Sequence, residues 1–551
     1  QRRSSLEGES EFAFAHALVR DVAYGQIARA DRAAKHRSTA EWIASLGRPE
    51  DHAEMLAYHW SSALELVRAS GSDDDEIAER TRLALRDAGD RAFRLNSYPV
   101  AAAQYEDALA LWPEDDAERP ELMFRQARAL YWAFDEERRR AALETARDAL
   151  VEAGDTDLAA EAESYLAQVS WYRGEGETTS AHLARAEELA GDSVSASAAR
   201  VLAVSARTRV IAEDLEDGRR LAESALAMAR ELGLEELRAH ALTSVGMAKN
   251  AVGDASGIED MEHALEIALE IDSPIAGTIV NNLAVETFFV GDMGRAEELY
   301  AESMRLSERL GDLEGARFVR TNLIYVDVFR GRWDAAMEAL DEFIAACEAG
   351  ASHTNESSMR GLRGSIRRAR GDAAGAVADH RRAVELARVQ GDRTEVASSL
   401  TICATTYADR GELEAARALA DEAITIIRET GSARGGVLEL IPFLDPLGIR
   451  EQLLQALDAN PPRRDVVWRS ATRLALKGDP LSAAELVSPT GNRWMEAVLR
   501  LSAGEQLIGL GERAEGEAEL TKALDFFRSV DASHTIATIE ALLASTQSES
   551  A

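Results

Sequence analysis

Apolar residues recur along most of the chain at the three- and four-residue spacing that places them on one face of an α-helix, and alternating strand-like runs are nearly absent. A glycine followed by a polar or charged residue interrupts this pattern every 38 to 40 residues, at Gly253, Gly291, Gly331, Gly371 and Gly411. A second glycine series falls about halfway between these positions, at Gly233, Gly311, Gly350, Gly391 and Gly431. Two turns per interval predict two helices per repeat, and therefore an all-α protein of stacked helix pairs.

Composition supports this fold class. The chain has 551 residues, which is beyond the length at which a single core keeps growing, so an elongated array or several domains are expected. Strong helix formers such as Ala, Leu, Glu and Arg are in excess, and aromatic residues make up only 6%. The 11 prolines leave long stretches in which helices can run, with two clusters at Pro442/Pro446 and Pro461/Pro462.

The second helix of each unit carries small residues where helices approach closely, as in GDMGRAEELYAESMRLSERLGD (Gly291–Asp312) and GELEAARALADEAITIIRETG (Gly411–Gly431). This pattern resembles the tetratricopeptide family, over roughly residues 80–545. The small site early in that family's second helix aligns with Ala296, Ala336, Ala376 and Ala416. Ala284 aligns with the small site of the first helix, and Tyr300 with the aromatic site. The resemblance implies a right-handed α-solenoid of antiparallel helix pairs.

The period of about 40 exceeds the usual 34 of that family, so each helix gains about one turn. This lengthened form resembles the sensor arms of bacterial STAND-class signal-transduction ATPases, such as maltose-activator-like and adenylate-cyclase-linked regulators. FAFAHALVRDVAY (Phe12–Tyr24) resembles the segment that closes the winged-helix domain in the same class. In the family motif a histidine reaches the β-phosphate of ADP, and the resemblance gives this nucleotide-sensing role to His16, with Arg20. Ala15 and Ala17 stand where the motif has Met and Asp, and the alternative is that His16 only caps or packs a helix start.

The first helices of tetratricopeptide repeats line a concave face. The family's variable contact positions on that face map onto His240, Thr243, Met247, Asn250, Thr278, Asn281, Thr321, Tyr325, Arg368, Thr401 and Thr405. This polar lining suits a peptide, a small molecule or a loop of a partner protein. The alternatives are that these residues face only water, or that they meet another part of the same polypeptide.

The segment RGLRGSIRRARG is a local basic patch in an acidic chain. Its arginines are Arg360, Arg363, Arg367, Arg368 and Arg370. Together they can receive a carboxylate or phosphate, and the alternative is a solvated face offset by nearby acids.

Charge and motif searches exclude several function classes. The formal net charge of −35 disfavours direct binding to nucleic acid or to an anionic membrane surface. Cys347 and Cys403 have neither CxxC nor histidine spacing for a metal, and no apolar run approaches the length of a membrane span or a signal peptide, so a cytoplasmic location is expected. No P-loop, HExxH, GxSxG or GxGxxG motif occurs. We therefore expect no enzyme activity, cofactor or metal in this chain.

The main hypothesis is a sensor module that binds an effector on its superhelix and controls an ATPase switch. It places a domain that binds ATP or ADP with Mg²⁺ upstream of Gln1, acting on a nucleotide cyclase or a transcriptional output. The alternative is a free-standing tetratricopeptide scaffold for protein–protein interaction. The expected organisation is the end of a winged-helix domain at 1–45, a linker helix and junction at 46–75, repeats at 76–440, an irregular joint at 441–465, C-terminal repeats and a cap at 466–545, and a polar tail at 546–551.

Overall fold

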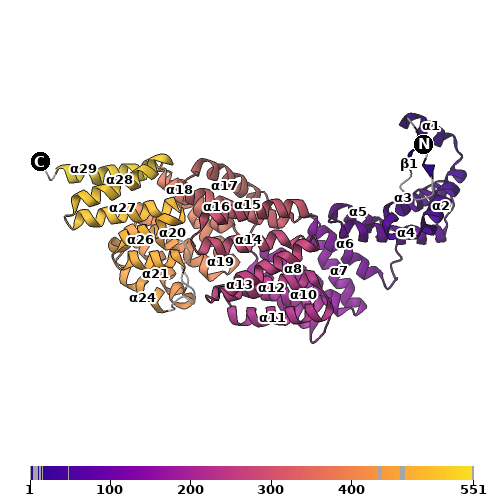
Figure 1. Cartoon of the computed structure of the whole chain (residues 1–551), viewed down its shortest axis with the longest axis horizontal. Helices are drawn as coiled ribbons and strands as arrows, with labels where there is room; N and C mark the ends of the chain where they lie inside the picture. The colour runs from indigo at the N-terminus through magenta and orange to yellow at the C-terminus, as the bar shows by residue number, and fades with distance from the viewer. Residues whose placement is uncertain are drawn as a thin grey trace. The chain divides into compact units, whose positions relative to one another are not determined.

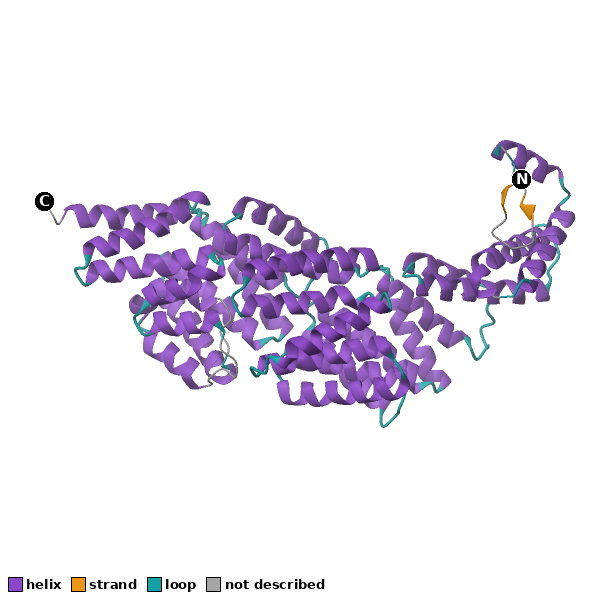
Figure 2. Ribbon diagram, viewed as in Figure 1, coloured by secondary structure: helices purple, strands orange, loops and turns teal. Residues whose placement is uncertain are grey.

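A computed structural model describes residues 2–3, 10–11, 14, 16–47, 49–431, 436–459 and 466–548 of the chain. Within these ranges the regular structure is helical except for two short strands, which pair antiparallel with Arg2 opposite Glu11 (Figure 2). None of the described helices is both long enough and apolar enough to cross a membrane. The chain divides into two compact units, Gln1–Gly154 and Asp155–Ala551.

The first unit stacks consecutive helices against one another. Its elements are β1 Arg2–Arg3, β2 Ser10–Glu11, α1 Ala17–Gln26, α2 Arg29–Ser45, η1 Pro49–His52, α3 Ala53–Arg68, α4 Asp75–Arg94, α5 Tyr98–Leu109, α6 Arg119–Trp132 and α7 Arg139–Ala153. Trp60, Tyr105 and Trp112 lie in its core. Helix α1 is different, because none of its residues is buried.

The second unit begins with seven helix pairs (Figure 1). They are α8 Thr156–Tyr172, α9 Gly176–Ala190, α10 Ala196–Ile211, α11 Leu215–Leu232, α12 Glu235–Ala251, α13 Ser256–Glu270, α14 Ile275–Phe289, α15 Met293–Leu310, α16 Leu313–Arg330, α17 Trp333–Glu348, α18 Glu356–Ala369, α19 Ala373–Gln390, α20 Arg393–Asp409 and α21 Leu413–Thr430. The remaining elements are α22 Gly436–Leu440, η2 Ile441–Phe443, α23 Leu444–Leu447, α24 Arg450–Ala459, α25 Val467–Leu476, α26 Pro480–Val487, η3 Ser488–Thr490, α27 Arg493–Gly509, α28 Arg513–Ser529 and α29 Ser533–Ser548.

The two glycine series lie in the turns between helices, as predicted. All ten glycines have positive φ, for example 93° at Gly291 and 80° at Gly311. In several repeats the next residue is an aspartate that begins the following helix. Asp312 accepts a hydrogen bond from the backbone N–H of Gly315 at 2.8 Å, and Asp372 accepts one from Gly375 at 2.9 Å. The Gly-Asp pair therefore ends one helix and caps the next.

The tetratricopeptide-like pattern is confirmed by packing. Ala284, Ala296 and Ala336 are fully buried, and Tyr300 is 4% exposed. Successive even-numbered helices from α8 to α20 contact one another as well as their odd-numbered partners. The even-numbered helices consequently form the inner layer: thirteen of the seventeen residues of α20 are buried, against five of the eighteen in α21.

The inner layer of the second unit closes on itself. Trp171 at the end of α8 stacks on Phe318 of α16, with ring centroids 5.8 Å apart. The backbone N–H of Thr354 donates to the carbonyl oxygen of Tyr172 at 2.6 Å, and α9 contacts α19. The repeat α18–α19 therefore lies against α8–α9, five repeats earlier in the chain. We call this contact the closure.

The C-terminal helices return along the middle repeats instead of extending the array. Helix α27 packs on α16, and α29 packs on α18. Trp494 of α27 lies 5.5 Å from Trp333, centroid to centroid. A β-carbon built on Gly331 would lie 2.8 Å from the ring of Phe526. The Phe526 side chain therefore packs against the glycine turn, where a larger residue would collide with it. The segment 441–465, predicted as an irregular joint, contains η2, α23 and α24, whereas Pro461 and Pro462 lie outside the described residues.

Candidate functional site

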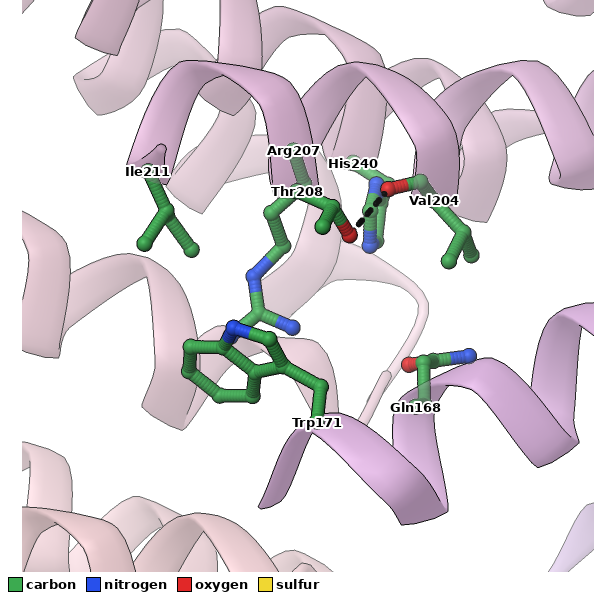
Figure 3. A pocket seen from close by; sticks show the side chains of 7 residues that line it. All are labelled: Gln168, Trp171, Val204, Arg207, Thr208, Ile211 and His240. Carbon is green, nitrogen blue, oxygen red and sulfur yellow. Dashed lines mark hydrogen bonds between the residues drawn. The ribbon is translucent and has the colours of Figure 1, made fainter. Parts of the chain in front are cut away.

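A small recess lies on the inner layer between α8, α10 and α12 (Figure 3). It is lined by Gln168, Trp171, Val204, Arg207, Thr208, Ile211 and His240. Its open volume is about 10 Å³, which is room for about one water-sized group. We call it the inner pocket.

Arg207 brings a positive charge to the inner pocket. Its guanidinium lies over the ring of Trp171, 5.0 Å from the centroid, and 5.9 Å from that of Tyr172. The guanidinium also hydrogen-bonds the side chain of Tyr172. Among the described residues, its buried Nε has no hydrogen-bond partner and no carboxylate forms an ion pair with it. Stacking on an aromatic face holds the guanidinium in place without neutralising it.

His240 adds a neutral imidazole beside this charge. Burial, together with Arg207 and Arg200, lowers the pKa of His240 to about 3. The ring is therefore uncharged at neutral pH, and its buried Nδ1 has no hydrogen-bond partner among the described residues. Of these two arginines, Arg200 is paired with Glu161 and Glu236, both at 3.2 Å, so Arg207 is the one that brings positive charge to the pocket.

The inner pocket adjoins the closure. Trp171 contacts both Arg207 and Phe318. Asp312, the capping residue of α16, is buried; burial raises the pKa of its carboxyl to about 6, although Gly315 N–H, Arg207 and Thr278 act in the opposite direction. At neutral pH this carboxyl is mostly ionised, so it partly offsets the positive charge of Arg207, although the two groups form no ion pair.

Most of the residues predicted to line a concave groove are packed between neighbouring inner helices. Six of them are buried: Thr243, Asn250, Asn281, Thr321, Thr401 and Thr405. The four threonine hydroxyls donate to carbonyl oxygens of their own helices at 2.7 to 2.9 Å. The inner helices touch on both sides, which removes from solvent the positions that a wider superhelix would expose.

Some of these residues connect successive inner helices. Asn322 donates to Asn281 Oδ1 at 2.8 Å, joining α16 to α14, and Asn355 donates to Thr321 Oγ1 at 2.7 Å. Thr278 donates to Asp312 at 3.4 Å. Two further partly buried positions, Met247 and Tyr325, pack against the main core. Their roles as ligand contacts stay predictions, and His240 is the predicted residue that lies at the inner pocket.

The chain itself covers another part of the predicted groove. Glu439 of α22 accepts hydrogen bonds from Arg368 at 3.0 Å and from Ser365 at 3.1 Å. A β-carbon on Gly436 would lie 2.5 Å from Thr401 Oγ1. The surface of α18 and α20 therefore meets another part of the same polypeptide, which was one of the alternatives that the sequence left open.

The basic patch is neutralised internally. Asp379, 2% exposed, accepts two hydrogen bonds from Arg363, at 2.6 and 2.9 Å, and one from Arg367 at 2.7 Å. Arg360 pairs with Glu356 at 2.8 Å, and Arg370 pairs with Asp334 at 2.6 Å. These arginines hold helices together. The alternative of a solvated face offset by nearby acids is right about the acids, but Arg360 is buried and not solvated.

The N-terminal candidates lie on α1. His16 is the N-cap residue of this helix, is exposed, and makes no capping hydrogen bond with its side chain. Arg20 pairs with the neighbouring Asp21 at 2.7 Å on the surface. The motif positions Phe12 and Ala15 lie outside the described residues. His16 and Arg20 therefore lie in the first unit, whereas the inner pocket belongs to the second.

Sequence reasoning missed Trp171 and Arg207 because it placed contact positions only in the repeats where the period is clearest. A signal was present: Trp171 and Tyr172 are adjacent aromatic residues just before Gly174, in a chain that is only 6% aromatic. Among the described residues, no group of three or more His, Cys, Asp or Glu side chains is arranged to hold a metal ion.

No protein-family model matches the sequence, and no curated protein matches it. Solved structures do match, among them the "Crystal Structure of Rap Protein Complexed with Competence and Sporulation Factor". That match has 15% sequence identity and a TM-score of 0.48, and it covers 65% of this chain and 100% of the other. Nothing about a ligand of this chain follows from a likeness at this level.

Proposed function

We propose that this tetratricopeptide-like protein is a protein-binding module that holds an acidic side chain of a peptide or partner protein in the inner pocket. The observation that carries the proposal is Arg207, a partly buried guanidinium stacked on Trp171 with an unpartnered Nε and no ion pair among the described residues. A carboxylate is the group that best satisfies such a guanidinium. The nearby Nδ1 of His240 leaves room for one more hydrogen bond.

Size and charge narrow the ligand further. The pocket has room for about one water-sized group, so a carboxylate oxygen fits and a bulky anion does not. The net charge of −35 repels a run of acidic residues at long range. The expected ligand is therefore a segment with one isolated Asp or Glu among neutral or apolar residues.

Replacing Arg207 with glutamine is expected to weaken binding tenfold or more, because a hydrogen bond to a charged group contributes about 1.5–3 kcal/mol. The probe is a fluorescein-labelled peptide selected from a phage-displayed random library on the unmodified protein, and its Kd is measured by anisotropy. The pKa of His240 is about 3, so its ring stays neutral between pH 5.5 and 8. Titration of His240 should therefore not change the affinity in that range.

The matched control is Arg305→Gln, which removes the same charge from an exposed position of α15. It should leave the Kd unchanged. Changing the acidic residue of the peptide to its amide should cost as much as Arg207→Gln, and the two changes together should cost little more than either one. Equal binding by the Arg207→Gln and unmodified proteins would exclude this function.

The exposed apolar side of α1 favours a second candidate function. Leu18, Val19 and Val22 are each more than half exposed, and no residue of this helix is buried. We propose that α1 packs against a nucleotide-binding domain, as in the STAND-class ATPases that Phe12–Tyr24 resembles. In that arrangement ATP or ADP with Mg²⁺ is bound outside the described residues, and effector binding on the repeats shifts the switch.

In a polypeptide that includes such an ATPase domain, His16→Ala is expected to reduce retention of ADP and to raise the basal output. The reason is the loss of the imidazole that the family places on the β-phosphate. Retained nucleotide is measured by chromatography after gel filtration, with His52→Ala as the control histidine. Nucleotide retention and output equal to those of the unmodified protein would remove this role from His16.

A further inference from the structure

A second and larger cavity lies at the closure, and the proposed function does not use it. Its volume is about 510 Å³, within the usual range for small-ligand sites. One wall is the turn between α8 and α9, with Arg173 and Glu175. The other walls are the start of α18, with Glu356 and Arg360, and the second half of α19, with Arg382. We call it the closure cavity.

The walls of the cavity are joined by one backbone hydrogen bond, one side-chain hydrogen bond and a close backbone approach. The Thr354 N–H donates to Tyr172 O at 2.6 Å, and Gln390 Nε2 donates to Thr354 Oγ1 at 2.8 Å. A β-carbon on Gly176 would overlap the carbonyl oxygen of Gln390. The cavity therefore exists in this form only while the closure is made.

Charges of both signs line the cavity in equal number. Arg173 pairs with Glu175 at 2.9 Å, and Arg360 pairs with Glu356 at 2.8 Å and with Glu348 at 2.9 Å. Arg382 pairs with Glu385 on the exposed side of α19. A polyanion such as a nucleotide would find its charge opposed by the wall carboxylates, whereas a molecule carrying one charge of each sign would not.

One buried donor in the wall lacks a partner. His353 is 3% exposed, and its Nδ1 accepts the backbone N–H of Asn355 at 3.0 Å. Burial, and secondarily Arg317, holds the pKa of His353 well below its usual range, so the ring is neutral and its proton sits on Nε2. Within the part of the chain that the structure describes, that Nε2–H has no hydrogen-bond partner. An unsatisfied buried donor is costly, so an acceptor from a ligand is favoured there.

We propose that the closure cavity binds a small zwitterion, an amino acid or a short unblocked peptide. Arg382 and the Nε2–H of His353 offer donors to its carboxylate. Glu356 and Glu175 offer acceptors to its ammonium, since a carboxylate can accept several hydrogen bonds. The ligand spans both sides of the closure, so its occupancy stabilises the closed form of the repeats.

The test combines binding with hydrogen exchange on the whole chain. The probes are the twenty amino acids and a panel of di- and tetrapeptides, each peptide also supplied with an acetylated N-terminus and an amidated C-terminus. We expect at least one zwitterion to bind in calorimetry and its blocked counterpart to fail. At ten times its Kd, the ligand should slow exchange of the Thr354 amide about tenfold, because it binds only the closed form.

Two adjacent arginines provide the matched variants. Arg382→Ala should weaken binding tenfold or more, and Arg381→Ala, which alters the neighbouring exposed residue outside the cavity, should not. Both positions are exposed, so both proteins should fold. The proposal is overturned if no zwitterion binds at 10 mM, an order-of-magnitude ceiling for a specific site. Equal binding of blocked peptides, equal effects of the two variants, or abolition of binding by Arg207→Gln would also overturn it.

Discussion

Gly176→Ala should open the closure. The added methyl group would overlap the carbonyl oxygen of Gln390. Both colliding groups are fixed to the backbone, so no side-chain rotation can relieve the overlap. Overpacking of this kind costs about 1–3 kcal/mol. At the upper end of that range, exchange of the Thr354 amide should accelerate by about two orders of magnitude, measured by hydrogen–deuterium exchange with mass spectrometry.

The control for this substitution is Gly509→Ala in α27. Gly509 has no neighbouring atom within 4 Å of an added β-carbon, so alanine should be neutral or slightly stabilising there. Exchange at Thr354 should stay at its original rate in this variant. Comparable acceleration in both variants would mean that the closure does not depend on the close approach at Gly176.

Asp379→Asn should lower the free energy of unfolding of the second unit by about 3–5 kcal/mol, because removing one partner of a buried ion network leaves uncompensated charge. Asp379 accepts from both Arg363 and Arg367, and Arg360 lies 3.7 Å away. The amide keeps the shape of the side chain but presents an N–H₂ group to these guanidinium groups. Urea unfolding followed by circular dichroism measures the loss.

Asp341→Asn is the matched control. Asp341 contacts the same arginines, at 2.8 Å from Arg363 and 3.9 Å from Arg367, but its side chain is 55% exposed. An exposed pair contributes about 0–1 kcal/mol. If the two substitutions were equally costly, burial of Asp379 would not be what makes this network important.

The repeat architecture could be predicted because each repeat contains its own sequence signals for helix ends and helix packing. A glycine that must adopt positive φ, an aspartate that caps the next helix, and an alanine such as Ala296 at a fixed offset recur with the same spacing. These signals depend on neighbours a few residues away. A single sequence therefore carries them without any knowledge of the tertiary structure.

The closure and the return of the C-terminal helices could not be predicted in the same way. Trp171 meets Phe318, and Gly331 meets Phe526, across separations much longer than one repeat. No periodic signal reports such pairs. The predictions for the groove residues suffered most from this. Thr405 lies on an inner helix as predicted, but contacts with neighbouring helices bury it.

The seating of the C-terminal helices on the glycine turns limits how this protein can change by gaining or losing repeats. In an open solenoid each repeat touches only its neighbours, so one unit can be deleted with a local cost. Here Gly291 faces Thr490, Gly331 faces Phe526 and Gly371 faces His534. Removing one repeat of about 40 residues would shift every later turn past its partner. The contacts between the glycine turns and the C-terminal helices therefore constrain the number of repeats. We expect the repeats and the C-terminal helices to unfold together and not one repeat at a time.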